Sequence, residues 1–416
     1  MNDTSKVLKN AIISADIPKM VEAVMQLSLE KRASDIHIEP RRNLVQIRLR
    51  IDGDLQVLVE YPLNLHPGVV SRIKIMSNLK IDESRLPQDG RITTFVGKIE
   101  VDLRVSTLPT TMGEKIVMRV LDKSKKIPTF KEMGIVGRNY ERIQQAMDQP
   151  NGILLTTGPT GSGKTTTLYS AMNYLNAPDV NILTFEDPIE NQMEGLNQSQ
   201  VRPDIGYSFA NGLRTALRQD PDIIMVGEIR DKETVDIAIE ASLTGHLVLS
   251  TIHTNSAVET ITRILNMKVQ DFLLTATINL IIAQRLAKKL CSNCKEAHPP
   301  SKGALKRIQQ AFRIFTEYEG FNLDLLNEPV MYEPKPGGCD QCEGQGYKGR
   351  IGIFEVLYMS NAIKTAIMEG QSSLQIQDLS QREGMVTLEQ DGLIKALQGE
   401  TSFEEVYKLV KNTEES

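Results

Sequence analysis

The chain has 416 residues, of which 40% are hydrophobic and 24% charged, as in an ordinary soluble protein of two or three domains. With 48 Lys and Arg against 53 Asp and Glu, the formal net charge of −5 argues against a nucleic-acid-binding surface over the whole molecule. No secretory signal is visible, and the only cysteines, four in two tight pairs, suit a reducing cytosol. We therefore expect a cytoplasmic protein that has no direct nucleic-acid partner and reaches a membrane only through partners.

The first part of the chain is expected to form a small α+β domain. Residues 34–60 and 91–121 alternate apolar and polar side chains as strands do, and helical spacing runs from Gly68 to Lys80 between them. We assign residues 19–121 to this domain and residues 1–18 to an N-terminal tail.

A change of period after about residue 138 predicts a second, larger domain. A charged, proline-containing linker, residues 122–137, leads into strand-like runs that alternate with helical segments. This alternation is typical of βαβ units and a mostly parallel sheet, which we place in residues 138–290. The strand-like runs are residues 152–157, 180–185, 222–227 and 246–252, and the helical segments lie near residues 163–175, 207–219, 231–243 and 256–265.

The most apolar stretch, Phe272 to Leu286, is interrupted by polar residues such as Thr275 and Gln284. It is too short and too polar to span a bilayer, so we expect a buried helix there. After Ile351 the chain is expected to be helical again. Residues 350–416 are assigned to a helical C-terminal subdomain that ends in an amphipathic segment.

A phosphate-binding loop is predicted where residues 158–165 read Gly-Pro-Thr-Gly-Ser-Gly-Lys-Thr, after a strand and before a helix. The glycines let amide N–H groups turn inward, and the helix start adds a positive dipole end. Lys164 is expected to reach the β- and γ-phosphates of ATP, and the Thr165 hydroxyl to ligate Mg²⁺. The predicted nucleotide-binding residues here are Gly158, Pro159, Thr160, Gly161, Ser162, Gly163, Lys164, Thr165 and Thr166.

A parallel-sheet ATPase also needs a carboxylate at the end of a nearby strand, to hold Mg²⁺ or to polarise water. Glu228 ends the apolar strand that begins at Asp222, and Glu186 follows another strand. We expect the two carboxylates one strand apart beside the strand of the phosphate loop, sharing the metal and water duties. Which of them activates water stays open.

Two of the five histidines, His246 and His253, bracket a third strand. His253 falls at the carboxyl end of that strand and is a candidate for sensing the γ-phosphate. The alternative is that either histidine is simply a packed or surface residue.

The four cysteines form two Cys-x-x-Cys pairs, Cys291 with Cys294 and Cys339 with Cys342. Two such pairs predict a tetrahedral zinc site, and because all four ligands are protein thiolates the zinc would be structural. Redox disulfides are the competing interpretation. We assign residues 291–349 to this subdomain.

The ordered set of motifs resembles the type II secretion and type IV pilus assembly ATPases. The resemblance covers almost the whole chain, from Arg32–Pro40 to Gly384–Leu388. Residues 186–190 match the Asp box of this family, Gly227-Glu228 its atypical Walker B motif, and residues 246–253 its His box. The resemblance implies a RecA-like core, a PAS-like N-terminal domain and a homohexameric ring.

The resemblance also implies that arginines contact the nucleotide phosphates. Arg91 and Arg104 match arginine fingers of the N-terminal domain, and Arg214 and Arg218 match further phosphate contacts and would bind nucleotide, as would His246. Without the resemblance, these arginines would be read as solvated surface residues.

In the family, the zinc element accompanies assembly and secretion members and is missing from the retraction branch. The implied function is a cytoplasmic motor at the inner face of the bacterial membrane, which adds pilin or pseudopilin subunits through an inner-membrane platform and cytoplasmic docking proteins. The alternatives are a retraction or DNA-translocating motor, or a nucleotide-gated scaffold without turnover. Family members commonly carry further N-terminal domains, whereas fewer than twenty residues precede the helix expected near Ile17, so the chain is either a short member or a truncated one.

Overall fold

The computed structural model describes residues 3–97, 99–122, 126–313 and 323–414. The chain divides into two compact units, Met1–Lys126 and Ile127–Ser416. Within the described residues, no helix combines the length and apolar character that crossing a membrane requires.

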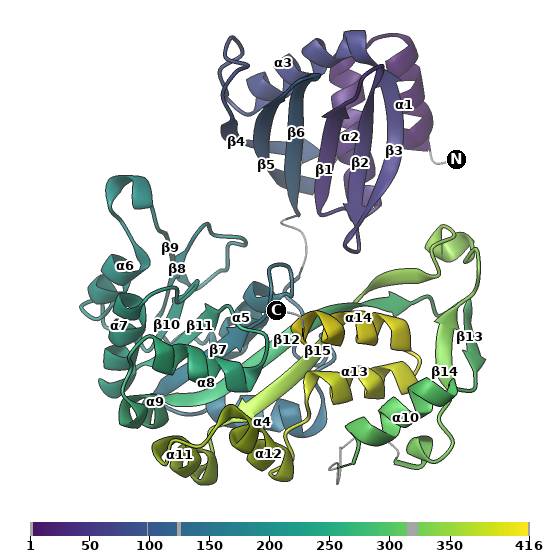
Figure 1. Cartoon of the computed structure of the whole chain (residues 1–416). Coiled ribbons are helices and arrows are strands. Elements are labelled where there is room, and N and C mark those ends of the chain that lie inside the picture. Colours follow the sequence, from purple (N-terminus) through teal and green to yellow (C-terminus); the bar gives the residue numbers. More distant parts are fainter. Residues whose placement is uncertain (1–2, 98, 123–125, 314–322, 415–416) are drawn as a thin grey trace. The chain divides into compact units, whose positions relative to one another are not determined.

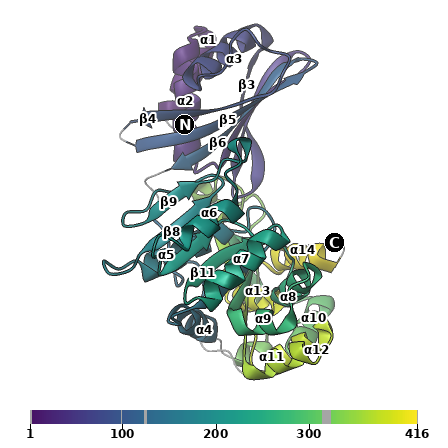
Figure 2. The same cartoon turned by 90° about the vertical axis from the view of Figure 1, so that its left-hand side faces the viewer.

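The N-terminal unit is an antiparallel sheet of six strands, in the order β3-β2-β1-β6-β5-β4, with its helices on one face (Figures 1 and 2). Alternate strand residues such as Ile36 and Leu103 point under the helices and are at most 1% exposed. The strands are β1 (Asp35–Pro40), β2 (Leu44–Ile51), β3 (Asp54–Pro62), β4 (Gln88–Val96), β5 (Ile99–Thr110) and β6 (Gly113–Asp122), and the helices are α1 (Asp3–Ile13), α2 (Ile17–Glu30) and α3 (His66–Met76).

Much of the segment assigned to an N-terminal tail is helical. Residues 3–13 form α1, and its Leu8 and Ala11 are buried in the same core as α2.

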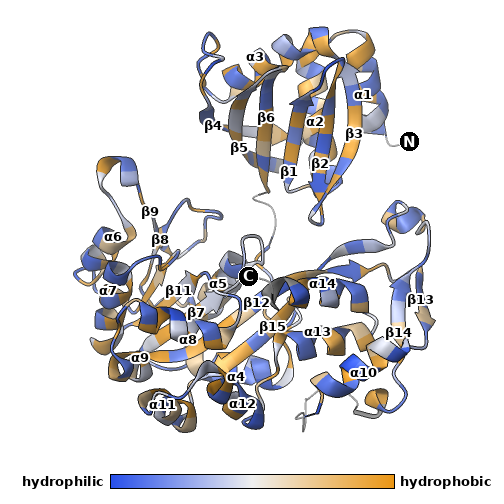
Figure 3. Ribbon diagram, in the orientation of Figure 1, coloured by the Kyte–Doolittle hydropathy of each residue, from blue (hydrophilic) through white to orange (hydrophobic). Residues whose placement is uncertain are grey.

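The second unit is built on a seven-stranded sheet in the order β15-β12-β7-β11-β10-β8-β9. All neighbours are parallel except β15, which runs antiparallel to β12. Helices cover both faces (Figure 1), and the apolar residues gather in the strands between them (Figure 3). The strands are β7 (Gly152–Thr157), β8 (Ile182–Glu186), β9 (Asn197–Gln200), β10 (Ile223–Val226), β11 (Leu247–Ile252), β12 (Ile278–Leu290) and β15 (Tyr347–Tyr358).

The predicted α/β class and the alternation of strands with helices are confirmed. On one face of the sheet lie α4 and α5, and the helices that follow pack mainly on the other face. The helices of the core are α4 (Gly137–Met147), α5 (Lys164–Leu175), α6 (Phe209–Ala216), α7 (Lys232–Leu243), α8 (Ala257–Asn266) and α9 (Asp271–Thr277).

Two helix predictions are wrong. The stretch from Phe272 to Leu286 is helical only in α9 and then becomes the long strand β12, whose run of β-branched residues at Ile278, Ile281 and Ile282 lies buried between β7 and β15. The chain after Ile351 is likewise a buried strand, β15, before it turns helical. Because most of β12 and the second half of the edge strand β15 are buried on both faces, these segments lack the alternation that would reveal a strand.

The remaining elements lie beside and beyond this sheet. Near the cysteines, two short strands pair with each other and a helix packs beside them, while four helices close the C-terminus against the sheet. These elements are β13 (Lys295–His298), α10 (Lys302–Ala311), β14 (Met331–Pro334), α11 (Asn361–Met368), α12 (Ser373–Arg382), α13 (Leu388–Leu397) and α14 (Phe403–Glu414).

Candidate nucleotide and metal sites

The carboxyl edge of the parallel sheet collects most of the predicted nucleotide residues. The phosphate loop follows β7, Glu186 ends β8, Glu228 follows β10 and His253 follows β11. Because parallel strands end at the same edge, these groups meet there, which is where open α/β sheets bind ligands. The strand order corrects one expectation: β11 lies between β7 and β10, so the strand next to the phosphate loop carries His253 and not a carboxylate.

The phosphate loop has the backbone conformation that its glycines allow. Gly158 and Gly163 have φ values of 147° and 91°, in the region that side chains with a Cβ avoid. A Cβ at Gly158 would lie 2.5 Å from the carbonyl oxygen of Gln284, so only glycine fits there. Helix α5 begins directly after Gly163, and the N–H groups of its first turn have no partner inside the helix.

This loop fits a bound phosphate group. The hydroxyl oxygen of Ser162 is buried and has no hydrogen-bond partner among the described residues. Thr165 and Thr166, at the start of α5, are exposed, as are Pro159, Thr160 and Gly161 in the loop. An anion seated on the helix start would therefore meet free donors from the backbone and a hydroxyl that lacks a partner.

Lys164 lies folded into this loop. Its amine donates hydrogen bonds to the carbonyl oxygens of Gly158 at 2.8 Å and Pro159 at 3.1 Å. Burial lowers the pKa of Lys164 to about 8, because a charged amine is poorly solvated there. The nearby Glu228 carboxylate opposes that shift, and Arg285 adds to it.

This pKa predicts how nucleotide affinity depends on pH. Below pH 8 the amine is protonated before the phosphates arrive, and above pH 8 it must take up a proton on binding. The affinity for ADP, measured by equilibrium binding, should thus be flat up to about pH 8 and then fall by about tenfold per pH unit. The variant Lys164→Arg keeps its charge, so its affinity should not show this fall, and an equal fall in both proteins would contradict the prediction.

Glu228 lies close to several charged groups. Its side chain is 15% exposed, it forms an ion pair with Arg230, and one of its carboxylate oxygens is 3.6 Å from Nε2 of His253. Burial lowers the pKa of the His253 imidazole below its usual value, and the charge of Lys164 lowers it further. The grouping of Lys164, Glu228 and His253 at one edge is what a site for a phosphorylated ligand requires. The sequence did not predict a role for Arg230, because a single arginine at the start of a loop belongs to no recognisable motif.

Glu186 has a different environment. Its carboxylate is 3% exposed and accepts hydrogen bonds from Tyr169 at 2.5 Å, Thr184 at 2.7 Å and Gln198 at 3.0 Å. Burial raises the pKa of the Tyr169 hydroxyl, so this hydroxyl stays protonated and can donate. Since Tyr169 belongs to α5, Glu186 ties the helix of the phosphate loop to β8. Its predicted duty toward metal or water stays a prediction, and its contacts favour anchoring.

Other predicted contacts lie farther away. His246 precedes β11 at the opposite edge of the sheet, about 20 Å of strand from His253, so it does not reach a phosphate bound at Lys164. Instead its Nδ1 is 2.8 Å from the carbonyl oxygen of Ala241. Its assignment as a nucleotide contact stays a prediction, which this placement does not support for a phosphate bound at Lys164 of the same chain.

Arg214 and Arg218 are both exposed. Arg214 donates to Glu233 on α7 at 2.6 Å, and Arg218 donates to the carbonyl oxygen of Arg214 at 3.0 Å. Helix α6 ends at Ala216, so Arg218 lies just beyond it. Their phosphate contacts stay predictions.

Arg91 and Arg104 lie side by side in the N-terminal unit, on the sheet face opposite its helices. Arg91 on β4 pairs in register with Arg104 on β5, which pairs with Arg119 on β6. All three line an open cavity of about 410 Å³, in which Asp35 accepts from Nε of Arg119 at 3.3 Å. The lining thus combines three arginines with two carboxylates, Asp35 and Asp89, and Arg119 is an arginine that the sequence alone did not single out.

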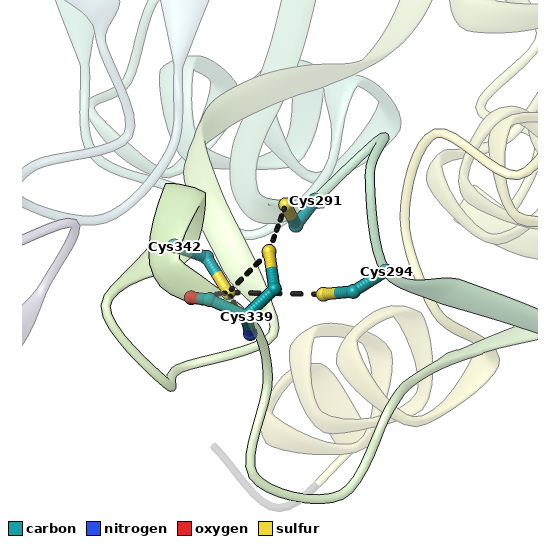
Figure 4. A group of neighbouring side chains, drawn as sticks. All are labelled: Cys291, Cys294, Cys339 and Cys342. Atoms are coloured by element: carbon teal, nitrogen blue, oxygen red, sulfur yellow. Dashed lines mark hydrogen bonds between the residues drawn. The ribbon is translucent and has the colours of Figure 1, made fainter.

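The four cysteines come together as predicted (Figure 4). All are free thiols, and Sγ–Sγ distances are 3.8 Å for Cys291–Cys339, 3.7 Å for Cys294–Cys342 and 3.8 Å for Cys339–Cys342. A tetrahedron with Zn–S bonds of 2.3 Å has edges of about 3.8 Å, so the cluster fits zinc. The side-chain amide of Asn293 donates to the sulfur of Cys339 and lowers the pKa of that thiol to about 6, which favours the thiolate that a metal needs.

Comparisons with known proteins agree with this geometry. The profile of the family described as type II/IV secretion system protein matches residues 11–408. A type IV pilus assembly ATPase PilB of Pseudomonas aeruginosa is 46% identical over 404 residues, which are 96% of this chain and 68% of that protein. The type II secretion system protein E of Xanthomonas campestris pv. campestris is 46% identical over 413 residues, which are 99% of this chain and 70% of that protein.

Solved structures show the same fold. The pilus retraction motor PilT with bound ADP is 26% identical, with a TM-score of 0.62 and coverage of 95% of this chain and 98% of that one. The ATPase DotB of Legionella pneumophila shares the fold, with a TM-score of 0.68 and 21% identity. The match covers 95% of this chain and 96% of the DotB chain. With a family profile that spans nearly all of its residues, this chain belongs to the type II/IV secretion system protein family.

Proposed function

We propose that this chain hydrolyses ATP to ADP and phosphate with Mg²⁺, and that hydrolysis powers the assembly of pilin or pseudopilin subunits. The observation that carries the proposal is the formed phosphate loop with Lys164, Glu228 and His253 at one edge of the sheet. Relatives that are 46% identical and named as a pilus assembly ATPase and a type II secretion protein support it.

Each residue has a role in this proposal. The first turn of α5 and Lys164 bind the phosphates, and the Ser162 hydroxyl donates to one of their oxygens. Thr165 and Glu228 would hold Mg²⁺, which when bound neutralises charge on the β- and γ-phosphate oxygens. Glu228 accepts the proton of the attacking water or orients that water, and His253 contacts the γ-phosphate. Glu186 fixes α5 through Tyr169.

The wider assembly is proposed on the family resemblance. The chain would act as a homohexamer in the cytoplasm at the inner membrane, with a platform protein and docking proteins as partners. Arg91, Arg104, Arg214 and Arg218 would add positive charge around the phosphates, as arginine fingers do. The zinc cluster favours assembly over retraction, because the family's retraction branch lacks it.

Phosphate release from the purified chain with Mg-ATP tests the proposal. We expect steady turnover by the wild type and a loss of at least about 10²-fold in Lys164→Ala, because the charge that contacts the transferring phosphoryl group is removed. Lys232→Ala, on the exposed start of α7, is the matched control and should turn over normally. A wild-type chain that binds ATP but releases no phosphate, even with its membrane partner, would instead be a nucleotide-gated scaffold.

A further inference from the structure

Gln284 lies directly beneath the phosphate loop, although no nucleotide motif contains it. It sits on β12 one residue beyond Ala283, which pairs with Thr157 at the end of β7. Its side chain is buried, with 1% of the residue exposed. The polar side chain is therefore enclosed at the point where β7 gives way to the loop, and a buried amide must find partners there.

Both ends of the Gln284 amide are bound. Nε2 donates to the carbonyl oxygen of Ser162 at 2.8 Å, and Oε1 accepts from the hydroxyl of Thr167 at 2.7 Å. A carbonyl oxygen can only accept, so the contact with Ser162 fixes which end of the amide carries nitrogen. Thr167 lies on α5, so one side chain holds both the loop and the helix that follows it.

The bond to Ser162 sets the direction of a peptide group. In a planar trans peptide the C=O and N–H bonds point in opposite directions. Because the Ser162 carbonyl points down to Gln284, the N–H of Gly163 in the same peptide points away from β12, toward the concave side of the loop. The Ser162 carbonyl is also kept out of the helical ladder of α5, in which the N–H of Thr167 donates to the Gly163 carbonyl at 3.1 Å.

Two glycines make this close approach possible. A Cβ at Gly163 would lie 3.2 Å from Nε2 of Gln284, and one at Gly158 would lie 2.5 Å from its backbone oxygen. The glycines of the loop thus serve the contact with β12 as well as the contact with phosphate.

We propose that Gln284 is a positioning residue for the nucleotide phosphates: its amide holds the Ser162 carbonyl and Thr167 so that the loop N–H groups face the ligand before it binds. This inference rests on the proposed function only in taking nucleotide phosphates as the ligand of the loop. Only a side chain with a donor and an acceptor at this length fills the role, so methionine and an ionised glutamate do not.

The test compares Gln284→Met and Gln284→Glu with wild type, using ADP and inorganic pyrophosphate as probes. We expect about 10- to 100-fold weaker binding of both probes to Gln284→Met, because the Ser162 carbonyl loses its donor and can turn into the site. Gln284→Glu should bind more weakly still at a pH at which its carboxyl group is ionised, since the carboxylate and the Ser162 carbonyl are then both acceptors. In steady state, the KM for ATP should rise by a larger factor than kcat falls.

The partner residue supplies a second, milder test should the Gln284 variants fail to fold. Thr167→Val removes the hydroxyl that holds Oε1, and we expect ADP binding to weaken by about 3- to 10-fold. Thr167→Ser restores the hydroxyl and should restore affinity, which a simple packing role for Thr167 does not explain.

Two results would overturn the role of Gln284. One is wild-type ADP affinity in Gln284→Met or, should that variant not fold, in Thr167→Val. The other is a loss of affinity for ADP without any loss for pyrophosphate, which would place the effect at the base or ribose. A wild-type chain that binds ADP but never hydrolyses ATP would overturn the proposed function. The comparison of ADP and pyrophosphate binding between wild type and the Gln284 variants would still test the role of Gln284.

Discussion

Replacing Glu228 by glutamine is expected to lower kcat for ATP hydrolysis by about 10²- to 10⁴-fold while ATP binding persists. The amide keeps the size of the carboxylate but can neither accept a proton from water nor carry the charge that Mg²⁺ prefers. Rapid-quench measurement of phosphate release, together with equilibrium binding of ATP, separates the chemical step from affinity.

Glu186→Gln is the informative comparison, because Glu186 is the other carboxylate for which the sequence predicted a metal or water duty. Its carboxylate accepts hydrogen bonds from Tyr169, Thr184 and Gln198. The substitution should therefore lower the melting temperature and change kcat much less than Glu228→Gln does. A folded Glu186→Gln protein with the kinetic defect expected of Glu228→Gln would show that Glu186 activates the water, and that our assignment of roles is reversed.

Loss of zinc is expected to unfold the segment around the four cysteines. Structural zinc sites contribute about 10–16 kcal/mol of apparent binding free energy at neutral pH, comparable to the whole stability of a domain. Cys291→Ser should therefore bind much less than one zinc per chain, as measured by elemental analysis. It should also show a lower melting temperature and become sensitive to proteolysis between residues 291 and 349.

Ser292→Ala, within the first Cys-x-x-Cys pair, leaves all four thiols in place and is the control, with zinc content and melting temperature expected at wild-type values. The competing interpretation, redox disulfides, predicts a protein without metal whose thiols resist alkylation until they are reduced. A purified wild-type chain with that behaviour would refute the zinc site.

The sequence sufficed for features that depend on local chemistry. Gly158, Gly163 and Lys164 are set by the shape of one loop, and each Cys-x-x-Cys pair by the geometry of one metal. The strand β7 is a short apolar run that ends just before Gly158, and β11 is one that begins soon after Gly245, so their residues appear almost as expected. These features need no knowledge of distant residues.

Features that depend on distant neighbours were out of reach. β12 was taken for a helix because burial on both faces removes its alternation. The order of β7, β11 and β10 in the sheet depends on which crossover connections pack best, and it cannot be predicted from the local sequence of any one strand. Gln284 looks like an ordinary polar interruption until the fold brings it to Ser162, more than a hundred residues earlier in the chain.

The long strand β12 has a mechanical consequence. Its first half pairs with β7, its middle touches the phosphate loop through Gln284, and its last residue, Leu290, adjoins Cys291. Antiparallel pairing with β15 runs from Gln284 to Lys288 and, after an irregularity in the register, includes Leu290, so this part of β12 cannot slip without breaking hydrogen bonds. The part of β12 between Gln284 and Leu290 is about 20 Å long and connects the phosphate loop to the first cysteine pair. We therefore expect a displacement of the phosphate loop to be transmitted along β12 to Cys291, so that the cysteine cluster moves with the strand that supports the loop.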